Sequence, residues 1–365
     1  MLRVGIVGLP NVGKSSLFNA LTAAGVPSEN FPFCTVDPNV GTVEVPDPRL
    51  DHLHELVGSK RKVPTFIHFV DIAGLVAGAS QGEGLGNRFL SHIREVDAIA
   101  HVLRCFEDPN VTHVAGSVDP VRDRDIVETE LVLADLESIE RRRERLTKKA
   151  RSGEKEAQRE LALVERVHAV LADGRPARLV EVEPEERTLL KQLQLLTAKP
   201  VLYVLNVAEG DLPQGRNRWT EAVEAALGSD GLERTVPVSS RVESELADLD
   251  PADRAEFLEG LGIEERGLDR LVREAYALLD LLTFFTSGEQ ESRAWTVRRG
   301  AKAPEAAGQI HSDFERGFIR AETIHYDEFV GIGSMKKARE EGRIRSEGKE
   351  YLVQDGDIML FRFNV

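Results

Sequence analysis

A phosphate-binding motif follows the first apolar run of the chain and constrains the fold more than any other feature. Residues 8–15 read Gly-Leu-Pro-Asn-Val-Gly-Lys-Ser and match the pattern G-x-x-x-x-G-K-[ST]. In this pattern backbone N–H groups cradle phosphates at the start of the next helix. The motif lies between a predicted strand at 2–7 and an apolar helix that includes Leu17 and Phe18. The sequence therefore predicts a nucleotide-binding α/β domain.

The loop itself supplies most of the predicted phosphate ligands. The Lys14 ammonium is expected to pair with the β- and γ-phosphates and to stabilise the transferring phosphoryl group, and the Ser15 hydroxyl is expected to bind Mg²⁺. The predicted nucleotide-binding residues of this loop are Gly8, Asn11, Val12, Gly13, Lys14, Ser15 and Ser16.

Two further positions complete the predicted magnesium site. Asp71 closes an apolar strand and begins a D-x-x-G motif, so its carboxylate is expected to hold Mg²⁺ through water. The N–H of Gly74, at the end of that motif, is expected to contact the γ-phosphate during catalysis. Thr35 lies upstream, and its hydroxyl is expected to join the Mg²⁺ ligands when the triphosphate is present. Each feature is common alone, but their order behind the phosphate loop makes the set specific.

The predicted base-recognition loop departs from the guanine pattern N-K-x-D, because the four residues from Asn206 read Asn-Val-Ala-Glu. Val207 replaces the lysine, and Glu209 replaces the aspartate that pairs with guanine. A site built on paired hydrogen bonds loses selectivity when its geometry changes. We therefore expect weakened guanine preference and tolerance of adenine, with Ser239 and Ser240 flanking the base from the other side. The alternative is that Glu209 still reaches guanine.

The catalytic position also departs from the common pattern. Many GTPases place a glutamine directly after D-x-x-G to orient water, whereas this chain has Leu75. Two residues are candidates for the missing role. His113 is suited to proton transfer near neutral pH, and its alternative is a surface loop histidine. The Asn11 side chain is suited to holding K⁺ near the phosphates, and its alternative is a loop position with no ligand role.

The composition indicates a protein of two or three domains. The chain has 365 residues, of which 41% are hydrophobic and 30% charged, with a formal net charge of −15. No apolar run is long enough for a membrane span, and the chain starts without a signal-peptide pattern, so we expect no membrane contact and a cytoplasmic location. The two cysteines, Cys34 and Cys105, form no disulfide or metal pattern.

The order of elements predicts a mostly parallel, doubly wound sheet. Nearly continuous apolar runs, typical of strands covered on both faces, occur at 2–7, 65–70, 98–105, 200–205 and 235–238. A polar cluster follows each run, and we expect these clusters to meet where the strands end. The predicted nucleotide domain covers 1–282 and carries a helical insertion at about 124–199. The tail, 283–365, is expected to be a small α+β domain with strands at 294–298, 318–321 and 358–363.

The insertion has the pattern of an antiparallel helical hairpin with a turn at Ser152-Gly153. Its first helix ends in a basic stretch that contains a single acid, Glu144. We consider this tip a candidate RNA or ribosome contact, with a solvated charged hairpin as the alternative. The basic residues of the tip are Arg141, Arg142, Arg143, Arg145, Lys148, Lys149 and Arg151.

Taken together, these motifs closely resemble the YchF/Obg-like ATPase family within the Obg-related P-loop proteins. The resemblance covers essentially the whole length and rests on segments 8–15, 30–35, 71–76, 82–87, 206–209, 293–296 and 355–359. It implies an OBG-type nucleotide domain, a coiled-coil-like insertion and a C-terminal TGS domain of ubiquitin-like shape. Leu75 matches a family trait, and His113 corresponds to the family's proposed catalytic histidine. The segment Ser239-Ser240-Arg241 departs modestly from the related pattern.

The resemblance also implies a preference for ATP over GTP, slow hydrolysis, and association with the ribosome, including its large subunit, and with translation factors. The hypothesis is therefore a cytoplasmic, ribosome-associated P-loop ATPase that also accepts GTP and acts as a switch in translation. One alternative is a conventional GTP-preferring switch. A second alternative is an RNA- or ribosome-binding adaptor in which the nucleotide is structural.

Overall fold

The computed structural model describes residues 2–23, 39–72, 85–228 and 235–364, and the chain packs into two compact units. The first unit comprises Met1–Thr42 and His68–Leu271, and the second comprises Val43–Ile67 and Val272–Val365. The sequence interpretation assigned residues 43–67 to the nucleotide domain, whereas here they pack with the C-terminal part of the chain. Their connecting strands, β2 and β4, pass from one unit to the other.

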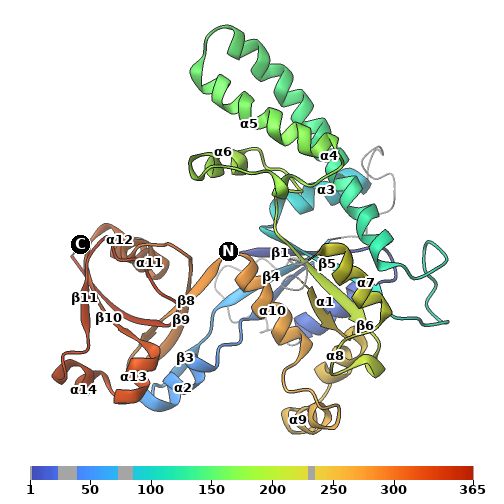
Figure 1. Ribbon diagram of the computed structural model, residues 1–365. Helices are drawn as coiled ribbons and strands as arrows, with labels where there is room; N and C mark the ends of the chain where they lie inside the picture. Colours follow the sequence, from blue (N-terminus) through green and yellow to red (C-terminus); the bar gives the residue numbers. More distant parts are fainter. Residues whose placement is uncertain (1, 24–38, 73–84, 229–234, 365) are drawn as a thin grey trace. The chain divides into compact units, whose positions relative to one another are not determined.

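The first unit is built on a six-stranded sheet in the order β2-β4-β1-β5-β6-β7 (Figure 1). Its strands are β1 (Arg3–Val7), β2 (Val40–Glu44), β4 (Phe66–Asp71), β5 (Ala98–Cys105), β6 (Val201–Val207) and β7 (Thr235–Val238). The pairs from β4 through β1, β5 and β6 to β7 are all parallel. Every residue of β5 and β6 is buried, as expected for strands covered on both faces. The predicted parallel sheet is confirmed, and β2 is a strand that the sequence analysis missed.

Helices follow most strands of this sheet. They are α1 (Lys14–Ala23), α3 (Leu85–Glu95), α7 (Arg218–Leu227), α8 (Ser240–Ala247), α9 (Pro251–Gly260) and α10 (Gly267–Leu278). α1 begins at Lys14 of the phosphate loop and buries Leu17 and Leu21. The N-terminal N–H groups of α1 therefore lie at the carboxyl end of β1, the geometry that binds anions.

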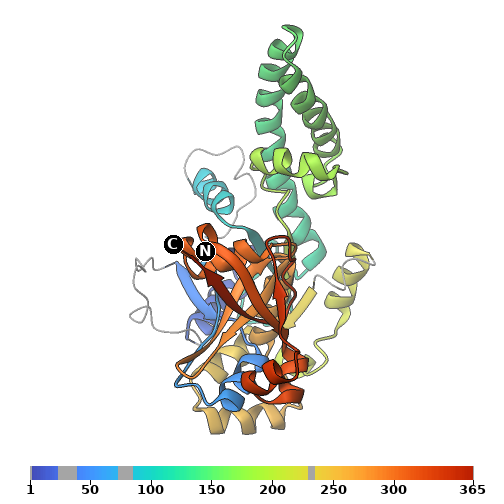
Figure 2. The same cartoon turned by 90° about the vertical axis from the view of Figure 1, so that its left-hand side faces the viewer.

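The predicted helical hairpin is present as α4 (Pro120–Arg151) and α5 (Lys155–Ala172), followed by α6 (Arg187–Gln192). α4 starts with Asp119 as its N-cap, whose side chain accepts the N–H of Arg122, and has proline in its first turn. Gly153, with φ of 87°, forms the turn between the helices. The hairpin has its own core, which includes Ile139, Leu163 and Val167. Its far end extends away from the sheet of its unit in both views (Figures 1 and 2).

The second unit contains another six-stranded sheet, in the order β11-β10-β12-β8-β9-β3. Its strands are β3 (Arg61–Val63), β8 (Leu281–Ser287), β9 (Glu291–Arg298), β10 (Phe318–His325), β11 (Arg345–Glu347) and β12 (Asp357–Phe363). Its helices are α2 (Pro48–Val57), α11 (Ala303–Ile310), α12 (Ser312–Arg316), α13 (Tyr326–Ile332) and α14 (Met335–Glu340). The three predicted tail strands lie within β9, β10 and β12, and the unit also includes residues 43–67 and 272–282, which the sequence analysis placed in the nucleotide domain.

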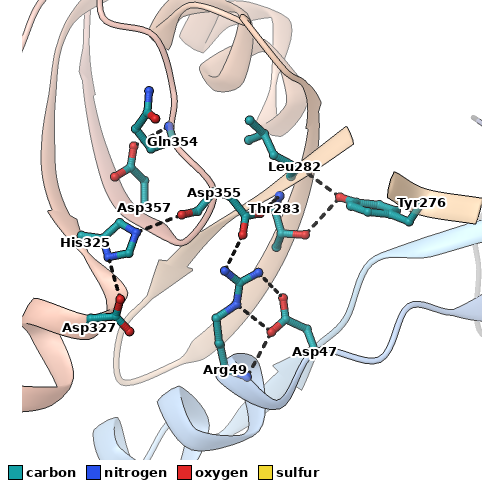
Figure 3. Close-up of polar contacts among 10 residues, drawn as sticks. All are labelled: Asp47, Arg49, Tyr276, Leu282, Thr283, His325, Asp327, Gln354, Asp355 and Asp357. Carbon is teal, nitrogen blue, oxygen red and sulfur yellow. Dashed lines mark hydrogen bonds and ion pairs between the residues drawn. The ribbon is translucent and has the colours of Figure 1, made fainter. Parts of the chain in front are cut away.

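Segment 43–67 is an integral part of the second unit. β3 pairs in parallel with β9, and Leu50 and Leu53 of α2 belong to the same core as Phe285. Arg49 at the start of α2 donates to Asp47 and, at 2.6 Å, to Asp355, whose other oxygen accepts the Thr283 N–H (Figure 3). Burial opposes the charge on Arg49, but its hydrogen bonds to the two aspartates outweigh this effect and raise its pKa.

Candidate nucleotide site

The phosphate loop needs glycine at two positions for reasons of space. A Cβ on Gly8 would lie 2.8 Å from the carbonyl oxygen of Val102 in β5. Gly13 has φ of +94°, and a Cβ there would lie 2.1 Å from the side-chain nitrogen of Asn206. A side chain at either position would push the loop off the sheet. The motif glycines therefore let the loop lie directly on the carboxyl ends of β5 and β6.

Lys14 and Asp71 form an ion pair in which the Lys14 Nζ contacts Asp71 Oδ1. Parallel pairing of β1 with β4, which places Ile6 beside Asp71, brings the aspartate to the phosphate loop. Both side chains are mostly buried, with 11% and 22% exposed. The predicted phosphate ligand and the predicted magnesium ligand thus meet at one point, although 57 residues separate them in sequence.

These residues fit Mg²⁺ chemically. The Ser15 hydroxyl and the Asp71 carboxylate are hard oxygen donors of the kind that Mg²⁺ prefers. Ser15 is exposed and directly follows Lys14, which contacts Asp71. No cluster of three or more His, Cys, Asp or Glu side chains suited to a metal occurs among the described residues. Thr35 and Gly74, and also Leu75, lie outside the part of the chain that the structure describes.

Asn206 links the phosphate loop to the loop after β7. Its side-chain Nδ2 donates to the Val12 carbonyl oxygen at 2.8 Å, and its Oδ1 accepts the Ser240 N–H at 3.0 Å. Asn206 is only 3% exposed. Because both ends of one buried amide are used, the distance between the two loops is fixed by a single residue. The asparagine of the predicted base-recognition motif therefore holds the phosphate loop to the loop after β7.

The other predicted base-contact residues have different environments. Val207 is 2% exposed within β6, whereas Glu209 is exposed and begins a 3₁₀ turn, Glu209–Asp211. Ser239 and Ser240 are both buried, and the Ser239 hydroxyl has no hydrogen-bond partner within the described part of the chain. A buried hydroxyl without a partner beside the phosphate loop is a candidate ligand for the base.

Two residues that the sequence analysis missed, Asp211 and Asn217, stabilise the loop that follows β6. Asp211 Oδ2 accepts the Ala208 N–H at 3.2 Å and the Asn217 Nδ2 at 2.8 Å. The same Asn217 Nδ2 donates to the Cys105 carbonyl oxygen at 2.8 Å, while its Oδ1 caps α7. Asn217 precedes an amphipathic helix, which is a recognisable N-cap signal, but its link to Cys105 spans 112 residues.

His113 lies in the loop after β5 and is buried. Its Nε2 is 2.8 Å from Asp123 Oδ2, and its Nδ1 accepts the Ala115 N–H at 3.1 Å. Since Nδ1 accepts, Nε2 carries the proton and donates to Asp123. Arg122 binds the other oxygen of Asp123 at 3.1 Å. The surface-loop interpretation of His113 is therefore wrong, because its side chain is only 4% exposed.

The His113 loop is also attached to the phosphate loop. Asn11, which is exposed, donates its Nδ2 to the Thr112 carbonyl oxygen at 3.1 Å. The phosphate loop is one of the five predicted polar clusters, and the structure joins the other four to it, directly or through Asn206. These are the segments at Asp71, Thr112, Asn206 and Ser240, and together they define the candidate nucleotide site.

The basic tip of the hairpin is partly neutralised. Arg141 pairs with Glu137 at 3.0 Å, and Arg142 pairs with Glu160 at 2.5 Å. The other basic residues of the tip form no ion pair with a described residue, and these are Arg143, Arg145, Lys148, Lys149 and Arg151. Within the ranges that the structure covers, no helix has the length and hydropathy to cross a membrane.

Comparison with known families gives two matches along the chain. Residues 3–129 match the family described as "50S ribosome-binding GTPase". Residues 281–364 match the YchF-GTPase C-terminal family, whose description reads "Protein of unknown function (DUF933)". The first match contains the phosphate loop and His113, and the second contains most of the C-terminal sheet.

Full-length relatives are also similar. A protein of Bacillus subtilis named "Ribosome-binding ATPase YchF" is 54% identical, and the match covers 100% of both chains. "Obg-like ATPase 1" of Oryza sativa is 46% identical, with 100% of this chain and 92% of the relative covered. The solved structure of the Schizosaccharomyces pombe YchF GTPase has a TM-score of 0.88 at 38% identity, covering 99% of this chain and 97% of that one. A GTP-binding protein from Pyrococcus horikoshii shares the fold, with a TM-score of 0.61 at 17% identity and 100% coverage of both chains.

Proposed function

The chain belongs to the YchF family, and we propose that it is a ribosome-associated P-loop nucleoside triphosphate hydrolase that prefers ATP. It accepts GTP as well, hydrolyses slowly with Mg²⁺, and acts in the cytoplasm as a nucleotide-dependent switch in translation. The contact between Lys14 and Asp71 carries the proposal, because it brings a phosphate-binding cation and a metal-binding carboxylate to the end of one parallel sheet.

Phosphate binding in this proposal begins from the Lys14–Asp71 ion pair. With a Mg²⁺–triphosphate bound, Lys14 would pair with phosphate oxygens and Asp71 would hold the metal through water. Ser15 and Thr35 supply hydroxyl ligands to the metal. When bound, Mg²⁺ neutralises charge on the β- and γ-phosphate oxygens. Lys14, the loop N–H groups and the Gly74 N–H stabilise the charge that develops on the transferring phosphoryl group.

His113 is the proposed group that orients or deprotonates the attacking water. In the structure Nδ1, the nitrogen that lacks a proton, already accepts the Ala115 N–H, and Nε2 donates to Asp123, so Nδ1 must be released from Ala115 before His113 can take a proton from water. A partner that moves the loop after β5 would therefore activate hydrolysis. We assign that role to the ribosome. In a solution with K⁺, the Asn11 Oδ1 is the proposed protein ligand for a second cation near the phosphates.

Base selection is assigned to the loops that Asn206 holds together. Glu209 is longer than the aspartate of guanine-specific sites, and Val207 contributes only its backbone to the surface, because its side chain lies in the core. The Glu209 carboxylate is therefore not placed as the aspartate of guanine-specific sites is, and adenine can bind without leaving a required hydrogen bond unmade. The Ser239 and Ser240 hydroxyls are the proposed polar contacts on the other side of the base.

Ribosome contact is assigned to the basic tip of the hairpin. Unpaired cations bind phosphate backbones by releasing counterions, so the proposed partner of the tip is RNA of the ribosome, including its large subunit. Arg143, Lys148, Lys149 and Arg151 lead this contact, because Arg141 and Arg142 already have carboxylate partners.

Equilibrium binding of ATP and GTP, with Mg²⁺ and K⁺ present, tests the proposed base preference. The parent protein is compared with a double variant carrying Val207→Lys and Glu209→Asp. We expect the parent to prefer ATP and the variant to shift towards GTP by at least tenfold, about 1.4 kcal/mol. A parent that prefers GTP would make the protein a GTPase with an unusual recognition loop.

Turnover separates an enzyme from an adaptor. The proposal predicts phosphate release from ATP that ribosomes accelerate and that His113→Ala reduces. Tight nucleotide binding without turnover, with or without ribosomes, would instead support the adaptor in which the nucleotide is structural. Retention of full stimulated turnover by His113→Ala would remove the catalytic assignment of His113 alone.

A further inference from the structure

Arg104 is the largest fully buried side chain in the described part of the molecule, with 2% exposed. It lies near the end of β5, in register beside Asn206 of β6. Adjacent partners in a parallel sheet project to the same face. Arg104 therefore projects from the same face of the sheet as Asn206. The phosphate motif gave no reason to single it out.

The guanidinium binds backbone carbonyl oxygens of that loop. Nε donates to Phe106 at 3.1 Å, Nη1 to Val111 at 2.9 Å, and Nη2 to Asp108 at 3.3 Å. The Arg104 side chain also lies over the Phe106 ring, with Cζ 4.7 Å from the ring centroid. Arg104 forms no ion pair with any carboxylate in the described ranges. Each of the three guanidinium nitrogens therefore donates one hydrogen bond to the same loop.

Burying the charged Arg104 side chain costs free energy of desolvation. A buried cation loses its hydration, and an apolar residue of similar volume is often equally good or better for stability. An apolar side chain, however, cannot bind three separate carbonyl groups. The planar guanidinium can, because its donors are fixed in one fork. Arginine at this position therefore holds the loop in one conformation.

The loop that Arg104 defines leads directly to the candidate catalytic residue. Val111, the last carbonyl bound by Arg104, precedes Thr112, whose carbonyl accepts from Asn11 of the phosphate loop. His113 follows. The loop is thus fixed from the strand below by Arg104 and from the phosphate loop by Asn11.

We propose that Arg104 is a positioning residue for nucleotide hydrolysis, acting through the loop 106–112 to set where His113 can reach. The inference rests on the proposed function, because it requires that His113 takes part in hydrolysis. It does not make Arg104 a phosphate ligand. Since a small misplacement of a reacting group lowers rates strongly, loss of the fork is expected to reduce the rate by tenfold to about a hundredfold.

The test is a double-mutant cycle in the full-length protein, using Arg104→Lys and His113→Ala. The readouts are single-turnover hydrolysis of ATP with ribosomes present and equilibrium binding of a non-hydrolysable ATP analogue. Arg104→Lys keeps the charge but cannot reach three carbonyls. We expect it to slow hydrolysis at least tenfold, to change analogue affinity less than threefold, and to have no further effect when His113→Ala is already present.

Arg254→Lys is the matched control. Arg254 also binds backbone carbonyls, those of Leu246 at 3.1 Å and Leu249 at 3.0 Å, but it does not contact the His113 loop. Its substitution is expected to leave hydrolysis unchanged. Hydrogen exchange of the amides in 106–116 is measured in parallel and is expected to speed up in Arg104→Lys but not in Arg254→Lys.

The outcomes distinguish the catalytic role of His113 from the positioning role of Arg104. Equal slowing by Arg104→Lys in the parent and in the His113→Ala background would overturn the positioning role while leaving His113 catalytic. Full activity of His113→Ala would overturn both the catalytic assignment and the inference built on it. If Arg104→Lys does not fold, Arg104→Gln and Phe106→Leu take its place, and unaltered loop exchange in these variants would also overturn the inference.

Discussion

The side-chain amide of Asn11 donates a hydrogen bond to the carbonyl oxygen of Thr112, at 3.1 Å. Asn11 belongs to the phosphate loop, and Thr112 directly precedes His113. The φ angle of Asn11 is 63°, in the left-handed region that asparagine tolerates better than most residues. A local backbone feature of the phosphate loop therefore directs this side chain to the loop that carries the candidate catalytic residue.

Asn11→Gly should separate these two loops without backbone strain, because glycine accepts a positive φ. In a K⁺-free solution, where the proposed contact of Asn11 Oδ1 with K⁺ does not operate, we expect single-turnover hydrolysis to fall by about threefold to tenfold as the His113 loop loses one anchor. Hydrogen exchange at Thr112 and His113 should increase. Unchanged exchange would mean that the Asn11–Thr112 contact does not hold the loop.

Asn206→Ala should damage both stability and nucleotide binding. The substitution leaves the Val12 carbonyl and the Ser240 N–H without their buried partner, which costs about 1–3 kcal/mol for each group. We expect a fall of several degrees in melting temperature and at least a tenfold loss of ATP affinity. Asn19→Ala, at an exposed position of α1, is the control and should change neither quantity. Normal affinity in a folded Asn206→Ala protein would contradict the bridging role.

Arg49→Met should destabilise the second unit. Arg49 joins Asp47 and Asp355 in a half-buried network, and its removal leaves both carboxylates with fewer donors. We expect a loss of about 1–3 kcal/mol, seen as faster hydrogen exchange in α2 and β8. Arg61→Met is the matched control in the same segment, because Arg61 pairs with Glu291 while 73% exposed and should contribute under about 1 kcal/mol.

Stability should decline in mild acid partly because of His101. Burial in β5, with help from the charges of Arg124 and Arg178, lowers the pKa of His101 from 6.5 to about 3. Below pH 6.5 the unfolded chain takes up a proton at this residue and the folded chain does not. The free energy of unfolding therefore falls by about 1.4 kcal/mol for each pH unit in that range.

Comparison with His101→Asn tests this effect. Denaturant unfolding is measured near neutral pH and about one unit below pH 6.5. The parent should lose about 1.4 kcal/mol more than the variant between these conditions, since the variant lacks this titrating group. An equal loss in both proteins would show that other groups control the acid response.

Neutralising the unpaired cations of the hairpin tip should weaken ribosome binding. The variant replaces Arg143, Lys148 and Lys149 with glutamine, and binding is measured over a range of salt concentrations. We expect lower affinity and a flatter salt dependence, because fewer counterions are released. The control replaces Arg216, Arg218 and Arg241, which are 62–77% exposed in the same unit. Equal effects in both variants would indicate a general charge effect rather than a contact at the tip.

Much of the nucleotide unit could be predicted from the sequence, because its signals are local. Continuous apolar runs identified the strands β5 and β6, which are buried on both faces. The turn at Gly153 and the apolar stripes of α4 and α5 identified the hairpin. Local patterns succeed where burial follows directly from the order of residues along one element.

The sequence by itself thus determined the phosphate loop, the parallel sheet, the hairpin and the set of candidate ligands. Only the tertiary structure decided that segment 43–67 packs in the C-terminal unit, where Arg49 meets Asp355 across 306 residues. It also decided that His113 is bound to Asp123 and that Arg104 defines the loop between β5 and His113. The physical reason is that these contacts depend on side chains brought together by the sheet register and by helix packing, and no local pattern in the sequence encodes such distances.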